Sequence, residues 1–369
     1  MPPSTISQPI NNAVLPAQSG DGFVVKAPVE LSGGDVLIGV SASAWSQAPG
    51  QISMQVWLDD QPADGNLSIY ANEGQMHMSL GHTWVLCESV PAGQHTIALE
   101  AGPTTVTDEN DRACVTVWQI GDDVAARFSV DAPCPQGTGQ TLFKGLVETE
   151  GGPLLISACA SGWVTQAATC ITGFTPVDGG DPARLEVFAN NANQHMSMVA
   201  TDYVYSAANR GLHEVLFNAD GLTSTDGGDT AHLAIVEWLG DGTSPRRLPM
   251  QNQLQNATAQ TQTGEGGTVA ASQFQAGGGT LLIRTNVSAW TTNPGLPLMI
   301  GIQIDGTSVG FTEIFANPAE THMAMVSNDL VVTGVTPGSH ELTLIGEANT
   351  YTDYNDRVSV MILEFDATM

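Results

Sequence analysis

The chain has 369 residues and a formal net charge of −28, because 38 acidic residues stand against only 10 basic ones. Its Lys and Arg residues form no cluster, so the chain lacks an electrostatic footprint for nucleic acid and would be repelled by an anionic membrane. The length is enough for two or three domains of ordinary size. With 40 Gly and 20 Pro, the composition is typical of a turn-rich β protein and falls short of a low-complexity chain.

The N-terminal stretch "MPPSTISQPINNAVLPAQSG" is polar and contains Pro. It has neither the basic region nor the apolar run of a signal peptide, and no run of about 18 apolar residues elsewhere could span a membrane. We therefore expect synthesis in a cytoplasm without export. Residues 1–20 are interpreted as an N-terminal arm.

Three copies of one unit follow along the chain. Their first segments are "GGDVLIGVSASAW" (33–45), "GGPLLISACASGW" (151–163) and "GGTLLIRTNVSAW" (278–290). In each copy the His of a His-Met motif lies 32 residues after the Trp. A second His lies 18 residues later, and the first Asp of a TDxxD motif lies 13 residues after that second His. The copies are offset by 118 and 127 residues, and they align without a gap from the Trp to the last Asp. A repeat of about 100 residues is a domain and not a solenoid unit.

The repeat and its flanking sequences divide the chain into six parts. The second linker is rich in Gln, Thr, Gly and Asn, which indicates a flexible or surface-hugging connection. The expected parts are an N-terminal arm (1–20), copy 1 (21–123), a linker (124–139), copy 2 (140–243), a linker (244–267) and copy 3 (268–369).

Short runs rich in β-branched and aromatic residues, such as "DVLIGVSASAW" and "HTIALEA", alternate with Gly, Pro, Asn and Asp. No segment keeps apolar residues at helical spacing over the length of a helix. About seven to ten strands in some 100 residues predict an all-β chain made of three tandem jelly-roll sandwiches.

The His-Met motif reads "MHMSL", "QHMSM" and "THMAM" in the three copies. The two-residue period of a strand places the methionines on the core face, where they fill space, and His77, His195 and His322 on the opposite face. Those histidines would face solvent or another copy. They are the candidate metal ligands only if the three copies meet around an axis, and we otherwise expect no metal.

The remaining repeated residues are interpreted as structural framework. The second histidines open an apolar strand after a Gly turn, the tryptophans end one, and the TDxxD carboxylates are typical of an Asx turn, with a contribution to a Ca²⁺ site as the alternative. These residues are His95, His213 and His340; Trp45, Trp163 and Trp290; Asp108, Asp226 and Asp353; and Asp111, Asp229 and Asp356.

Five cysteines are present, at positions 87, 114, 134, 159 and 170, with no CxxC pair. Copy 3 has none, so the unit does not need a disulfide. We expect free, buried thiols, with a Cys87–Cys114 bridge as the alternative. No GxSxG, HExxH, P-loop or GxGxxG in strand–helix context is found, so we expect no catalytic residues, no cofactor and no enzyme activity.

One segment of each copy, followed by a final strand, resembles a known family of domains. The three segments are "WVLCESVPAGQHTIALEAG", "VYSAANRGLHEVLFNADG" and "LVVTGVTPGSHELTLIGEAN". They resemble the C-terminal half of jelly rolls of the tumour-necrosis-factor and complement-head type, in the version of bacteriophage decoration, spike and fibre proteins. The resemblance implies a trimeric arrangement, and therefore a pseudo-trimer within this single chain. It also implies that the histidine after the Gly turn is structural.

The resemblance implies a virion surface protein whose partner is a capsid shell. We expect a decoration or cement protein at threefold or quasi-threefold sites, with the arm 1–20 as a docking segment. The alternative is a head or tail spike that binds a host-surface receptor or glycan. Linking three copies in one chain raises their effective concentration and lets each copy specialise its loops.

Overall fold

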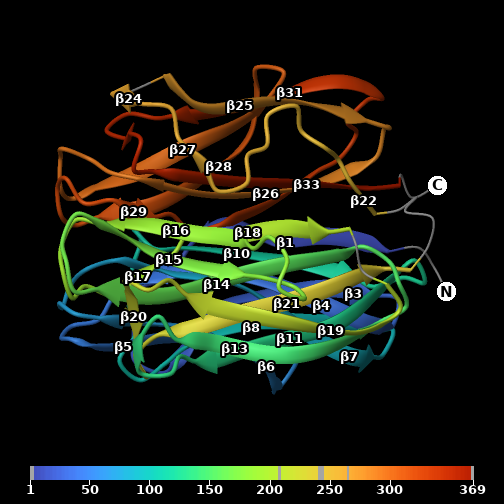
Figure 1. Ribbon diagram of the computed structural model, residues 1–369, viewed down its shortest axis with the longest axis horizontal. Helices are drawn as coiled ribbons and strands as arrows, with labels where there is room; N and C mark the ends of the chain where they lie inside the picture. The colour runs from blue at the N-terminus through green and yellow to red at the C-terminus, as the bar shows by residue number, and fades with distance from the viewer. Residues whose placement is uncertain (1–3, 207–208, 240–244, 264–265, 367–369) are drawn as a thin grey trace.

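The computed structural model describes residues 4–206, 209–239, 245–263 and 266–366. Over these residues the chain forms 33 strands and no helix, and all strand pairs are antiparallel. The described part contains no helix that could span a membrane. The strands build three two-sheet jelly rolls in tandem, as the repeat predicts (Figure 1).

Copy 1 contains an inner sheet in the order β1-β10-β4-β7 and an outer sheet in the order β3-β8-β5-β6, with β2 and β9 as a short pair at one end. The strands are β1 (Thr5–Val14), β2 (Gln18–Ser19), β3 (Gly22–Leu31), β4 (Gly34–Ala44), β5 (Gly50–Leu58), β6 (Gln61–Ala71), β7 (Met78–Val90), β8 (Gly93–Ala101), β9 (Val106–Thr107) and β10 (Arg112–Gln119).

Copy 2 repeats this topology. Its inner sheet has β11, β21 and β14, with β17, β18 and β20 along β14, and its outer sheet has the order β13-β19-β15-β16. The strands are β11 (Val124–Pro133), β12 (Gly137–Thr138), β13 (Thr141–Thr149), β14 (Leu154–Val164), β15 (Thr169–Thr175), β16 (Ala183–Ala189), β17 (Met196–Ser197), β18 (Thr201–Tyr205), β19 (Gly211–Ala219), β20 (Thr223–Thr225) and β21 (Thr230–Trp238).

Copy 3 has an inner sheet of β22, β23, β33, β26, β29 and β30, and an outer sheet in the order β25-β31-β27-β28. The strands are β22 (Arg246–Arg247), β23 (Ala257–Thr258), β24 (Gln262–Thr263), β25 (Gly267–Ala276), β26 (Thr280–Ala289), β27 (Leu296–Ile304), β28 (Thr307–Ala316), β29 (Met323–Ala324), β30 (Asn328–Val332), β31 (Gly338–Gly346), β32 (Tyr351–Thr352) and β33 (Arg357–Phe365).

The segments expected as arm and linkers are strands of the sandwiches. β1 pairs with β10 in copy 1, β11 pairs with β21 in copy 2, and β22 and β23 pair with β33 in copy 3. Each lies at an edge of its inner sheet, where its backbone groups pair with the last strand of the copy. The segments expected as an arm (1–20) and as linkers (124–139 and 244–267) thus contain edge strands, and β11 is half-buried along most of its length.

Each copy has its own apolar core between its two sheets. Alternate residues of the strands supply it, as in β19, where Val215 and Phe217 are buried between more exposed neighbours. The motif methionines Met78, Met196 and Met323 belong to the three cores, which confirms that they are packing residues.

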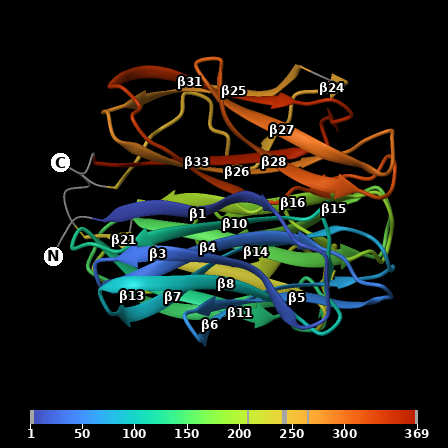
Figure 2. The same ribbon diagram turned by 180° about the vertical axis from the view of Figure 1, so that it is seen from behind.

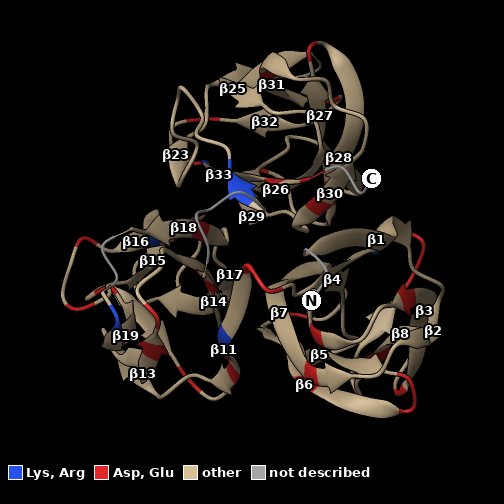
Figure 3. Cartoon of the chain, turned by 90° about the vertical axis from the view of Figure 1, so that its right-hand side faces the viewer, with Lys and Arg blue, Asp and Glu red and all other residues tan. Residues whose placement is uncertain are grey.

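The three copies surround a common pseudo-threefold axis. Figure 3 looks along this axis from the end where both chain ends lie, and the three sandwiches stand around its centre. Figures 1 and 2 show the same assembly from its two sides, with the strands running along the axis. The inner sheets share a fourth apolar cluster, built from all three copies. It includes the equivalent residues Leu37, Leu155 and Leu282, all buried.

Candidate functional site: the threefold interface

The His-Met motif is the contact that one copy makes with the next. The backbone N–H of His77 in copy 1 donates to Asn317 Oδ1 in copy 3, at 2.6 Å. His322 of copy 3 donates in the same way to Asn190 of copy 2, at 2.8 Å. His195 of copy 2 donates to Asn72 of copy 1, at 2.7 Å, and closes the ring. The interface is therefore head-to-tail and closes after three copies.

An aromatic contact accompanies each of these hydrogen bonds. The ring of His77 packs edge-on against Phe315, with 4.9 Å between ring centroids. Tyr70 and Phe188, which are equivalent to Phe315, lie 5.3 Å from the ring of His195 and 5.1 Å from that of His322. The His-Met motif of one copy and the Tyr/Phe-Ala-Asn sequence of its neighbour thus form the two sides of each interface between copies.

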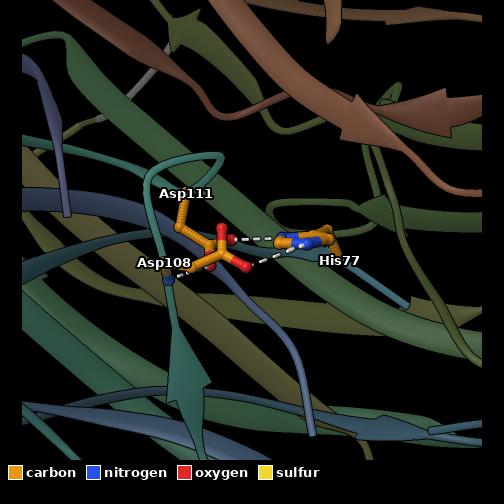
Figure 4. Close-up of side chains that lie close together, drawn as sticks. All are labelled: His77, Asp108 and Asp111. Carbon is orange, nitrogen blue, oxygen red and sulfur yellow. Dashed lines mark hydrogen bonds and ion pairs between the residues drawn. The ribbon is translucent and has the colours of Figure 1, made fainter. Parts of the chain in front are cut away.

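Each motif histidine is held by the TDxxD turn of its own copy (Figure 4). His77 Nδ1 lies 2.9 Å from Asp111 Oδ1, and its Nε2 lies 3.7 Å from Asp108 Oδ2. Asp111 is fully buried, and its Oδ1 also accepts the hydroxyl of Ser43 at 2.9 Å. The Nδ1 distances in copies 2 and 3 are again 2.9 Å, to Asp229 and Asp356.

The TDxxD motif forms a tight turn between two strands. The N–H of Asn110 donates to Asp108 Oδ1 at 2.8 Å, and the N–H of Asp108 donates to Asp111 Oδ2 at 3.0 Å. Asp226 with Asp229, and Asp353 with Asp356, repeat this pattern. The first carboxylate thus caps the turn, and the second joins turn, strand and histidine.

A metal is not needed to explain these groups. In each copy the ligand atoms of one His and two Asp lie within 4.8 Å of one another, but the buried second Asp already accepts hydroxyl, imidazole and backbone donors. Over the described residues, His77, His195 and His322 form no group with one another. The candidate three-histidine site on the axis is therefore not formed, because each ring turns to the carboxylates of its own copy.

Two of the three interfaces carry an Arg–Glu pair, and the third replaces both partners. Arg112 Nη2 of copy 1 lies 2.7 Å from Glu313 Oε1 of copy 3, and Arg357 of copy 3 pairs with Glu186 of copy 2. The equivalent residues of copies 2 and 1 are Thr230 and Ser68. Here the Thr230 hydroxyl donates to the Ser68 carbonyl at 2.6 Å.

The third interface has a carboxylate of its own. Asp131, on β11, accepts the Thr83 hydroxyl and the Asn66 N–H of copy 1, both at 2.8 Å, and pairs with His232 of its own copy. The strand expected as a linker therefore supplies the polar contacts that the missing Arg–Glu pair would have made.

One layer of the axis holds a different residue from each copy. The equivalent positions on β4, β14 and β26 are Gly39, Ser157 and Arg284, and Arg284 is fully buried. Its Nη1 donates to Ser157 Oγ at 2.9 Å, so residues from copies 2 and 3 meet here. A side chain at Gly39 would come within 3 Å of Trp84 and Asp329, so a glycine is required there.

The second set of equivalent axial positions neutralises the arginine. These positions are Trp84, Asp202 and Asp329. Arg284 binds Asp329 through Nε at 2.5 Å and Nη2 at 3.0 Å, and Asp202 through Nη1 at 2.6 Å. Its guanidinium also lies over the Trp84 ring, 4.6 Å from the centroid. The Arg284 and His82 charges hold the pKa of Asp329 well below its usual range against the opposing effect of burial.

His82 completes this network from copy 1. Its Nε2 lies 3.1 Å from Asp329 Oδ2. Burial lowers the pKa of His82, with a contribution from the Arg284 charge, although Asp329 and Asp202 oppose the shift. His82 therefore adds an imidazole to the buried layer that holds Arg284 and its two aspartates.

The second histidines clamp a turn at the edge of each outer sheet. His95 Nδ1 lies 2.8 Å from Asp59 Oδ2, and its Nε2 lies 2.9 Å from the carbonyl of Pro91. His213 and His340 pair in the same way with Asp178 and Asp305. The carboxylate hydrogen bonds raise the pKa of all three histidines.

The Asp–His pairs show that the copies differ in length within a segment that the constant Trp-to-His spacing makes look identical. The Asp and His are 36 residues apart in copy 1 and 35 apart in copies 2 and 3. Because the spacings from Trp to both histidines are equal, copy 1 has one residue fewer before its Asp59 and one more after it. The gap-free alignment is therefore wrong within this segment. The register between β5 and β6 of copy 1 shifts here, with one residue of β5 (56) opposite three of β6 (63–65).

The tryptophans lie behind the motif histidines. Trp45 pairs its backbone with Val106, and Trp290 with Tyr351, so each fastens the end of an inner strand to the strand before the TDxxD turn. The ring of Trp45 lies 6.0 Å from that of His77, and the equivalent distances are 6.2 and 6.1 Å.

All five cysteines are free thiols, and the Cys87–Cys114 bridge is not formed.

Several interface residues carried no signal at the sequence level. Arg284 differs from its equivalents Gly39 and Ser157, and the Asp at positions 202 and 329 is a Trp in copy 1, so a search for residues repeated in all three copies passes over them. The acidic residues near the ends of the last strands also have partners that the sequence did not indicate. Glu237 accepts hydrogen bonds from the backbone N–H groups of the turn at 150–152, and Glu364 accepts those at 277–278. Comparing equivalent positions for unlike charges would have found the first group.

No protein-family model matches the chain, and no curated protein matches it in sequence. Solved structures resemble it weakly. One, described as a triple jelly-roll fold and turret assembly in an archaeal virus, is 13% identical with a TM-score of 0.23, covering 99% of this chain and 90% of that one. Broad bean stain virus is 7% identical with a TM-score of 0.23, over 64% and 88%. A β-porphyranase of glycoside hydrolase family 86, from Bacteroides plebeius, is 9% identical with a TM-score of 0.22, over 68% and 38%. Viral shell proteins and an enzyme both occur among them, so the assignment of three jelly rolls rests on the strand order itself.

Proposed function

We propose that the chain is a non-enzymatic structural protein of a virion, a decoration or cement protein that stabilises a capsid at threefold or quasi-threefold sites. The observation that carries this proposal is the closed head-to-tail ring of three copies. It gives a single chain a threefold shape, so one molecule suits one threefold position of a symmetric shell.

The distribution of the contacts supports a scaffold. The inner sheets form the shared apolar cluster and the axial charge layer. The repeated His, Asn, Trp and Asp residues form or support the ring of contacts between copies. The outer sheets and their loops remain for a partner. A cement protein of this kind would bury subunit junctions and raise the resistance of the shell to heat and internal pressure.

Cryo-electron microscopy of the particle that carries the protein tests the proposal. We expect one chain at each occupied threefold position, and a lower temperature of genome release in particles assembled without the protein. Absence of density at the shell surface, together with unchanged thermal and osmotic stability, would contradict it. Binding to a glycan array without binding to shells would instead support a receptor-binding spike.

A further inference from the structure

Arg247 is the exception among the basic side chains. The other nine are engaged: eight form ion pairs or hydrogen-bonded pairs with carboxylates, and Lys26 lies over the Phe23 ring. Within the described part of the chain, Arg247 has no carboxylate within ion-pair distance. It nevertheless lies half-buried in β22.

The position of Arg247 in the fold is apolar in the other two copies. Cross-strand partners share a face of a sheet. Arg247 is paired with Leu363, as Ile6 is with Trp118 and Ala126 with Val236. Those three partners belong to the central apolar cluster, and Ile6 and Ala126 pack against it. Copy 3 therefore places a guanidinium at the rim of an apolar cluster.

Among the described residues, the surroundings offer this guanidinium no free counter-charge. Asp202 of copy 2 is the anion whose field reaches it, but Asp202 already binds Arg284 at 2.6 Å. Burial lowers the pKa of Arg247, and Asp202 opposes that shift. A half-buried charge without a partner is costly, and an apolar residue would pack better here.

Strand β22 lies toward the end of the molecule that carries both chain ends (Figure 1). Figure 3 shows the two-arginine strand β22 in blue, close to the centre where the three copies meet, on the end that carries both chain ends. Arg246, its neighbour, is already paired with Glu364, and its Nε donates at 2.6 Å. Arg247 is half-buried near Asp202 of copy 2, and over the residues that the structure describes its guanidinium has no hydrogen-bond or ion-pair partner.

We propose that Arg247 is an anion-binding position on this end of the molecule, and that its ligand is a carboxylate of the protein surface to which the pseudo-trimer attaches. A guanidinium binds carboxylates in a bidentate manner, and arginine is enriched among residues that dominate interfaces. A phosphate of nucleic acid or membrane is disfavoured as the ligand, because the net charge of −28 repels such polyanions. The identity of the partner as a shell protein rests on the proposed function; binding of an anion does not.

The first test uses the free, full-length chain and citrate as the probe. In ¹⁵N spectra of arginine side chains, citrate added at constant ionic strength should shift one Nε–H resonance in a saturable manner. That resonance should be missing in Arg247→Ile. It should be unaffected in the control Arg210→Gln, which removes an exposed charge paired with Glu150 of the same copy. A shift that chloride reproduces, or one that survives in Arg247→Ile, would overturn the assignment.

The second test uses shells without the protein. Arg247→Ile, which installs the residue of copy 1, should raise the unfolding temperature of the free chain and weaken binding to the shell by about tenfold or more. Arg210→Gln should bind as the unmodified chain does. If the unmodified chain binds shells and Arg247→Ile binds equally well, the proposal for Arg247 fails and the proposed function stands. If citrate binding saturates and no shell is bound, the anion position stands and the proposed function fails.

Discussion

The ring of His–Asn contacts and the axial layer of Arg284 belong to the same inner sheets, yet they obey different rules. The ring uses the same residue types three times, with nearly equal distances. The axial layer uses Gly, Ser and Arg on one set of strands and Trp, Asp and Asp on the next. A ring contact occurs once between each pair of copies, so three identical solutions fit. On the axis three side chains compete for one space, and three arginines could not share it.

Arg284→Met tests the asymmetric region and should have the largest effect. It leaves Asp202 and Asp329 buried without their counter-charge, and breaking a buried ion pair costs about 3–5 kcal/mol. The midpoint of chemical denaturation should fall accordingly. Arg284→Met combined with Asp202→Asn and Asp329→Asn should recover much of the loss. Equal stability of the single variant and the unmodified chain would show that the charges of this layer are not buried together.

Arg112→Thr tests the difference between the three peripheral interfaces. It leaves Glu313 largely buried without its arginine, and burial already raises the pKa of Glu313 while Arg112 opposes that shift. We expect a loss of about 1–3 kcal/mol in unfolding free energy at pH 7. Adding Glu313→Ser copies the Thr–Ser interface of copies 2 and 1 and should restore part of it. Additive effects in this double-mutant cycle would contradict a direct coupling.

His77→Ala, His195→Ala and His322→Ala test the symmetry of the contacts that the histidine side chains add to the ring. Each removes one donor to a buried carboxylate, at a cost of about 1–3 kcal/mol, and the three costs should agree within about 0.5 kcal/mol. The measurement is thermal unfolding of each single variant under one set of conditions. A clear outlier among the three would mean that the ring is not equivalent in its energetics, although its distances are.

The pH dependence of the outer clamps should be the smallest effect. The pKa values of His95, His213 and His340 are raised by their carboxylate partners. Burial acts to raise the pKa of Asp59 and Asp178, but hydrogen bonds outweigh it, and the pKa values of Asp59, Asp178 and Asp305 are all lowered. The stabilisation is therefore complete between the unfolded-state values of about 4 for Asp and about 6.5 for His.

Above that window the clamps weaken as each histidine loses its proton, and below it they weaken as each aspartate gains one. The unfolding free energy of the unmodified chain should fall between pH 6 and pH 8 by more than that of a triple His→Gln variant at positions 95, 213 and 340. Parallel pH profiles for the two proteins would show that the clamps do not titrate with folding.

The sequence was sufficient for the repeat, the strand content and the three jelly rolls, because each depends on local patterns that recur three times. It also indicated that the motif histidines face away from the core, toward solvent or another copy, since the two-residue period of a strand assigns them to the opposite face. It did not reveal that residues 1–20 and the linkers contain strands, because a polar edge strand and a polar linker have similar compositions.

The threefold interface was decided by the tertiary structure alone. Asn72, Asn190 and Asn317 were part of a repeated motif, but their partners lie in other copies more than 100 residues away. A search for residues shared by all three copies could not find Arg284 and its two aspartates, because Arg284 occurs in one copy and the aspartates in two. Local patterning determines which face of a strand is buried, whereas only the assembled axis determines which charges can be buried together.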